Sequence, residues 1–116
     1  MRWEDIVQLA TQWPEVEQAV SYGEPSLKVR KSLLTRHRVD DDSLVLIDVP
    51  VDERDHLIEM MPEAFFVEPH YHGHDIVLAR LSHLPPDIAK RLLERRWRNT
   101  ATKRAIAQYD RASPRA

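Results

Sequence analysis

The hydrophobic positions at the start of the chain repeat with the period of a helix. They lie at Trp3, Ile6, Val7, Ala10 and Trp13, which follow the i, i+3, i+4, i+7 spacing of one buried face. Pro14 ends the pattern, so a helix is predicted over residues 3–13. Two tryptophans on one face indicate packing against a broad surface, which favours a sheet.

From residue 17 to residue 49 the pattern changes to short segments rich in β-branched and apolar residues. It predicts strands over 17–23, 26–30, 33–39 and 43–49. Turns are predicted at Gly23 with Pro25, at Lys31–Ser32 and at Asp40–Ser43. The run 44–47 is apolar on both faces, so the last of these strands is predicted to be central in the sheet.

The second half of the chain alternates between the two patterns. Asp52, with Asp55 in the capping-box position, predicts a helix that Pro62 ends, and strands are predicted over 64–68 and 75–81. A third helix begins at the prolines 85–86, a break is predicted at 99–100, and a short helix follows over 102–110. Arg96 falls inside the apolar arc of the third helix, so either its guanidinium reaches solvent or it meets a buried acid.

Composition limits the class of protein. The 116 residues, 42% hydrophobic and 31% charged, fit one α+β domain over 1–112 with helices packed on a mostly antiparallel sheet, followed by a frayed tail at 113–116. No apolar run has the length of a membrane span, and acids stand in the first helical turn, so neither a signal peptide nor an anchor is expected. The absence of cysteine favours a cytoplasmic protein without disulfides or thiolate sites. A monomer is the simplest expectation.

Charge is distributed unevenly. Residues 1–89 carry a balance of −9 and residues 90–116 a balance of +7. A basic C-terminal segment on an acidic body suggests either an anionic partner or basic helices that lie over the acidic surface of the same chain. If these cations share a face with Lys28, Arg30 and Arg38, nucleic-acid binding gains support; if they cover the acids of residues 40–68, it loses support.

Several motifs in order carry a resemblance to a known family. They are 13–17 (WPEVE), 21–30 (SYGEPSLKVR), 62–66 (PEAFF), 69–71 (PHY), 76–81 (IVLARL) and 97–98 (WR). Together they resemble the MmcQ/YjbR-like family over nearly the whole chain. The resemblance implies a sandwich similar to CyaY/frataxin and a double-wing arrangement that binds DNA. The chain departs from that family at Lys31–Ser32, where Gly-Lys is usual, and at Arg96, where a small residue is usual.

Two groups of cations are therefore candidates for contacts with a phosphate backbone. The hairpin group is Lys28, Arg30, Lys31, Arg36 and Arg38, and the helix group is Lys90, Arg91, Arg95 and Arg98. The hairpin group could equally form a solvated sheet face balanced by Glu24 and the acids at 40–42. The outer face of any amphipathic helix is charged, so the helix group is a weaker signal.

Other candidate sites carry weaker signals. His70, His72 and His74 would converge on a metal only in an extended segment; Pro69 and Gly73 favour a turn, so no metal or cofactor is expected. The most characteristic motif, Tyr22, Gly23 and Pro25, is interpreted mainly as a structural turn. The alternative is a small-ligand cleft lined by Tyr22, Lys28 and His70. No phosphate loop, dinucleotide fingerprint or nucleophile elbow is present, so no enzymatic activity is expected. The alternative to DNA binding is a protein- or small-ligand-binding module.

Overall fold

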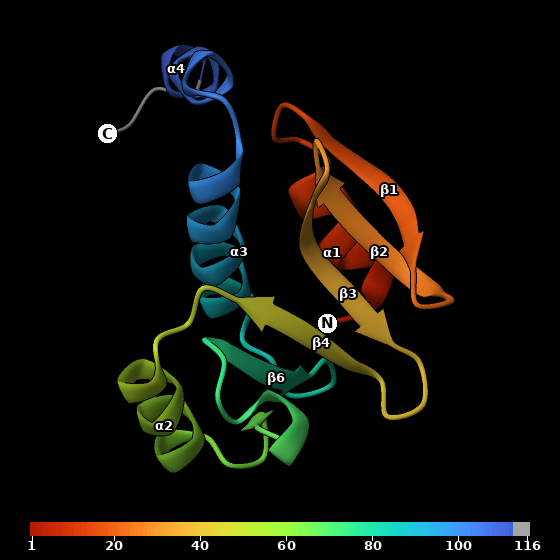
Figure 1. Ribbon diagram of the computed structural model, residues 1–116, viewed down its shortest axis with the longest axis vertical. Coiled ribbons are helices and arrows are strands. Elements are labelled where there is room, and N and C mark those ends of the chain that lie inside the picture. The colour runs from red at the N-terminus through yellow and green to blue at the C-terminus, as the bar shows by residue number, and fades with distance from the viewer. Residues whose placement is uncertain (113–116) are drawn as a thin grey trace.

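Six antiparallel strands form one sheet in the order β1–β2–β3–β4–β6–β5. In the computed structural model, which describes residues 1–112, the strands are β1 (Val16–Ser21), β2 (Glu24–Val29), β3 (Ser32–Arg38), β4 (Ser43–Ile47), β5 (Phe65–Phe66) and β6 (Ile76–Arg80). The helices are α1 (Trp3–Ala10), α2 (Val51–Met60), α3 (Pro86–Thr100) and α4 (Lys103–Ala112), with a 3-10 turn η1 (Pro69–Tyr71) (Figure 1). The predicted α+β class is confirmed, and so is the central place of β4.

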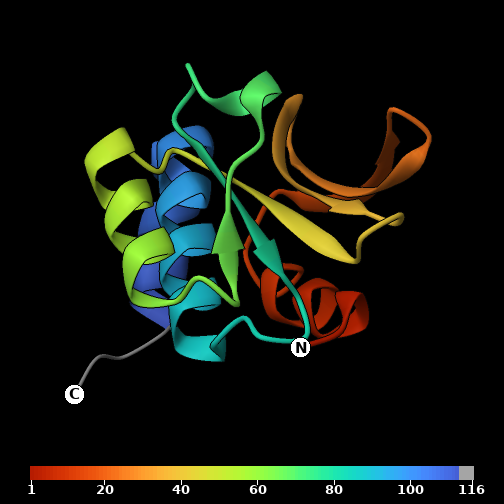
Figure 2. The same ribbon diagram turned by 90° about the horizontal axis from the view of Figure 1, so that it is seen from below.

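The two faces of the sheet have different surroundings. One face packs on α1 and α3 and holds most of the core, including Leu27, Leu46 and Val77. The register pairs Arg36 with Val45 and Val45 with Leu78, so these side chains share a row on the other face. We call this second face the open face; η1 lies on that side of the sheet, opposite α1 and α3 (Figure 2).

Two tryptophans join the terminal helices to the sheet. Trp13 and Trp97 are buried and stack with their ring centroids 5.8 Å apart, and the Trp97 indole N–H donates to the Pro14 carbonyl at 2.8 Å. Helix α1 ends at Ala10 rather than at the predicted residue 13, so Trp13 enters the core from the turn that follows. Trp3 is only half-buried and stacks on His37.

The first two hairpin turns differ from the prediction. The β1–β2 turn is formed by Tyr22 and Gly23, both at positive φ, and Pro25 lies within β2. Strand β2 ends at Val29, so Arg30 is a turn residue at φ +60° and does not share a strand face with Lys28. The backbone of a left-handed residue turns away from the strand direction, which is why the turn falls one residue earlier than predicted.

Helix boundaries also shift. Pro50 precedes α2 and its carbonyl accepts from the Arg54 amide, so Asp52 lies in the first turn and does not cap the helix. Helix α3 continues through the predicted break to Thr100, whose hydroxyl donates back to the carbonyls of Arg96 and Trp97. Strand β5 is two residues long, and η1 begins at Pro69, three residues after the strand ends.

Within residues 1–112, none of the helices combines the length and apolar character that crossing a membrane requires. The predicted tail at 113–116 lies outside the described residues.

Candidate functional site

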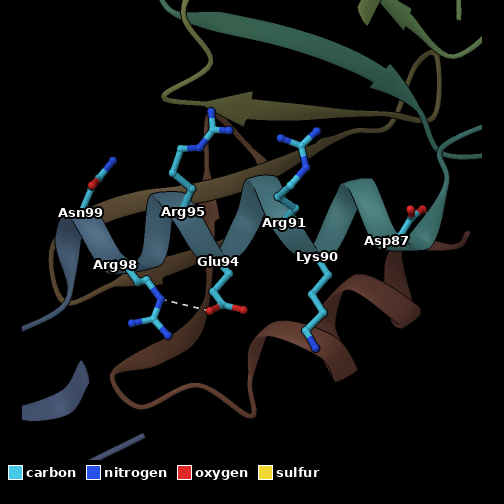
Figure 3. A pocket seen from close by; sticks show the side chains of 7 residues that line it. All are labelled: Asp87, Lys90, Arg91, Glu94, Arg95, Arg98 and Asn99. Atoms are coloured by element: carbon cyan, nitrogen blue, oxygen red, sulfur yellow. Dashed lines mark hydrogen bonds and ion pairs between the residues drawn. The ribbon is translucent and has the colours of Figure 1, made fainter. Parts of the chain in front are cut away.

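The outer face of α3 presents the cations of the helix group, and most of them already hold a carboxylate. Arg95 binds Glu53 of α2 through two hydrogen bonds of 2.6 and 2.9 Å, and Arg91 donates to the same carboxylate at 3.1 Å. The Arg95 guanidinium, supported by Arg91, outweighs burial and lowers the pKa of Glu53. Figure 3 shows Arg91 and Arg95 pointing to the same side of α3, away from Glu94 and Arg98.

The remaining arginines of α3 are paired in the same way. Arg98 binds Glu94 at 3.0 Å and Asp110 of α4 at 2.7 Å, and Arg96 binds Asp48 at 3.1 Å and the Leu33 carbonyl at 3.0 Å. Arg96 thus meets a half-buried acid, one of the two alternatives that the sequence left open. The depression of about 590 Å³ over α3 is lined largely by these paired charges. The α3 arginines cover the acids at 48 and 53, the arrangement that lowers support for nucleic-acid binding.

Two of the hairpin cations also form ion pairs with carboxylates of this chain. Arg36 forms an ion pair with Glu24 and donates to the Tyr71 hydroxyl at 2.8 Å. Arg38 lies between Asp41 at 3.1 Å and Glu68 at 2.9 Å. Both arginines lie on the open face, where each carboxylate already takes the place that a phosphate oxygen would need. Lys28 is half-buried on the same face, opposite Glu17 in the register.

The β2–β3 turn carries the hairpin cations that stay exposed. Arg30 and Lys31 are exposed, and they line a depression of about 480 Å³ together with Thr100 at the end of α3. Lys103 and Arg104, in the first turn of α4, are exposed as well. No ion pair within residues 1–112 is formed by any of these four cations. We call Arg30, Lys31, Lys103 and Arg104 the basic end.

Glu15 joins the two halves of the basic end. Its carbonyl accepts from the Arg30 amide at 3.3 Å, and its carboxylate accepts from the amide and the hydroxyl of Thr102, both at 2.9 Å. The Thr102 hydroxyl in turn accepts from the Ala105 amide at 3.1 Å, which caps α4. The backbone hydrogen bond from Thr102 is the largest cause of the lowered pKa of Glu15.

The sequence did not single out Lys103 and Arg104. A signal was available, because cations in the first turn of a helix oppose its dipole. Arg30 breaks a second local rule, since a non-glycine residue in the left-handed region costs about 1–2 kcal/mol. Both violations occur at the same end of the molecule.

The open face holds a separate cleft of about 540 Å³. Its apolar lining consists of Leu33, Val45, Ile47 and Ile76 from three strands. Its polar and aromatic lining consists of Tyr22, Arg36, His70 and Tyr71. Tyr22 and His70 of the predicted ligand cleft therefore line one depression, and Lys28 is not among its lining residues.

The loop that contains His70, His72 and His74 is fixed by hydrogen bonds to its backbone carbonyls and not through the imidazole rings. Arg54, with 2% of its side chain exposed, donates to the carbonyls of His72 and His74 at 3.0 and 3.3 Å. The three histidines are exposed. Across residues 1–112, no three His, Cys, Asp or Glu side chains gather closely enough to hold a metal ion.

Comparison with protein-family models, with curated protein sequences and with solved structures finds no match to this chain.

Proposed function

We propose that the protein binds the phosphate backbone of nucleic acid, weakly and without sequence preference, through the basic end. The observation that carries the proposal is that Arg30 and Lys31 line one depression with Thr100, that Lys103 and Arg104 follow three and four residues after Thr100, and that all four cations are exposed and form no ion pair in the described chain. Cations that serve the fold, such as Arg95 and Arg96, are paired in this protein. Cations that cost local stability and hold no carboxylate are available to an external anion.

The resemblance to the MmcQ/YjbR-like family supports the same proposal, because the β2–β3 hairpin stands where that family is described as having a wing. The interface is smaller than the sequence suggested. Arg36, Arg38, Arg91, Arg95 and Arg98 leave the proposed set because each holds a carboxylate of this chain. Lys28 leaves it because its side chain is half-buried on the open face. Lys103 and Arg104 join the set.

The basic end is suited to phosphates rather than to base edges. Reading a base by hydrogen bonds relies on side chains such as asparagine, glutamine or arginine held in a groove. The basic end offers flexible cations beside the start of a helix, which suit phosphate oxygens. With about two to four phosphates neutralised, log K is expected to fall against log[salt] with a slope of roughly −2 to −3.5.

A salt-dependent titration of duplex DNA tests the proposal. Arg30→Gly and Lys31→Ala are each expected to flatten the slope by about one phosphate contact. Arg30→Gly cannot act by misfolding the turn, since glycine adopts φ +60° without strain. The matched controls are Lys90→Ala, an exposed lysine near the far end of α3, and Arg38→Ala on the open face; both are expected to leave the slope unchanged.

Absence of binding to duplex and single-stranded DNA at about 50 mM salt, where electrostatic attraction is strong, would remove this function. The protein- or small-ligand-binding module would then be the better interpretation.

A further inference from the structure

The cleft on the open face takes no part in phosphate binding at the basic end, and its construction needs a separate explanation. Leu33, Ile47 and Ile76 are half-buried aliphatic side chains on the face of the sheet opposite α1 and α3, where polar residues are usual. A volume of about 540 Å³ is within the range of small-molecule sites, which combine an apolar lining with a few polar groups. The open face therefore has the composition of a ligand site.

The polar edge of the cleft consists of hydrogen-bond donors. Arg36 donates to the Tyr71 hydroxyl oxygen at 2.8 Å, which leaves the hydroxyl proton of Tyr71 available to an acceptor in the cleft. The guanidinium also polarises that O–H bond and makes it a stronger donor. Next to it, the His70 ring packs edge-on against the Tyr71 ring at 4.8 Å.

The aromatic edge of the cleft is held in a strained position. Tyr22 is 88% exposed and has φ +55°, a conformation that a bulky residue adopts only at a cost. Its ring lies 5.2 Å from the guanidinium carbon of Arg36, so a flat surface borders the cleft next to the donor edge. Such a surface suits stacking with a planar ring.

We propose that the open-face cleft binds a small aromatic carboxylate. The aliphatic lining and the Tyr22 ring would contact the planar body, and the Tyr71 hydroxyl would donate to a carboxylate oxygen. The described lining contains no carboxylate, and Glu24, which pairs with Arg36, is not among its residues, so an anion would meet no like charge within the lining. A positively charged group at the same place would face that guanidinium.

Titration with 2-naphthoate, followed by amide chemical shifts, tests this proposal. The expected Kd is about 0.1–1 mM for a ligand of this size. The shifts are expected at Val45, Ile47 and Ile76. The neutral 2-naphthamide is expected to bind more weakly, and naphthalen-2-ylmethylammonium more weakly still.

Tyr71→Phe keeps the ring and removes the donor, so it is expected to weaken 2-naphthoate binding about 5-fold or more. The matched control is Tyr109→Phe in α4, which packs on Trp97 away from the cleft and is expected to leave the Kd unchanged. Lys31→Ala is also expected to leave it unchanged, so this proposal and DNA binding fail separately.

The proposal is overturned by any of three results. They are absence of binding up to about 5 mM 2-naphthoate, shifts centred on the outer face of α3 instead of the open face, and equal binding of the carboxylate and the ammonium compound. Wild-type affinity in Tyr71→Phe would likewise remove the donor from the site and, with it, the proposed ligand class.

Discussion

Removing the guanidinium of Arg95 tests whether the cations of α3 stabilise the fold or serve a partner. Arg95 and Glu53 join α3 to α2 through two hydrogen bonds of 2.6 and 2.9 Å, and Arg95 also donates to the Asp48 carbonyl at 3.1 Å. Helix α2 buries only Arg54 and Leu57 fully, so it has few other contacts to fix its position. We therefore expect Arg95→Met, which keeps the aliphatic stem, to destabilise the protein.

The expected loss of stability in Arg95→Met follows from the geometry and the exposure of the ion pair between Arg95 and Glu53. The Arg95 and Glu53 side chains are 33% and 26% exposed, so solvent screens part of their attraction. A two-point arginine–carboxylate contact of this kind contributes about 1–2 kcal/mol, above the range of a fully exposed pair. Loss of the donor to the Asp48 carbonyl adds about 0.5–1 kcal/mol. The ion pair of Arg91 with Glu53 should contribute at most about 0.5 kcal/mol to the stability of the fold, because the Arg91 side chain is 52% exposed.

The assay is a double-mutant cycle measured by urea denaturation. Arg95→Met, Glu53→Gln and the double variant are expected to give a coupling energy of about 1–2 kcal/mol, with every variant still folded. In the same preparations, Arg95→Met is expected to leave the salt slope for DNA unchanged. A coupling energy below about 0.5 kcal/mol, or a flattened salt slope in Arg95→Met, would show that the assignment of α3 to a structural role is wrong.

Two further predictions concern the core and the response to acid. Trp13→Ala removes a buried ring that stacks on Trp97 and is expected to cost about 3–5 kcal/mol; a variant that melts like the wild type would contradict this packing. The pKa values of Glu15 and Glu53 are lowered in the folded protein, so their stabilisation is present above about pH 4.3 and is lost as the pH falls through the folded-state values. Urea denaturation from pH 7 to pH 3 should show this decline, and Glu15→Gln should make it shallower.

The elements of this fold follow from local periodicity, and their boundaries do not. Each predicted helix and strand is present in the structure because alternation and the i, i+3, i+4 spacing record which face is buried. The boundaries at Arg30, Pro25 and Asp52 were wrong because they depend on single backbone angles and on amide partners such as the Pro50 carbonyl. Patterns of side-chain type do not encode those choices.

The candidate site was harder to predict, since it depends on pairs that are distant in sequence. Arg36 is neutralised by Glu24, and Arg95 by Glu53, which are 12 and 42 residues away. In the sequence these arginines look the same as Arg30, which has no ion pair within the described residues. Only the tertiary arrangement separates cations that stabilise the fold from cations that remain available.

The two proposed sites share one property: each contains residues that are unfavourable for the stability of their local structure. Arg30 and Tyr22 both lie in the left-handed region, which aspartate, as at Asp42 and Asp48, tolerates better than these large side chains do. Lys103 and Arg104 stand where the helix dipole favours acids. Each of these choices lowers stability, and none is offset by an ion pair within residues 1–112. Residues that disagree with their local structure are expected mainly at functional sites. The basic end and the open-face cleft are therefore better candidates than the larger but internally balanced set of charges along α3.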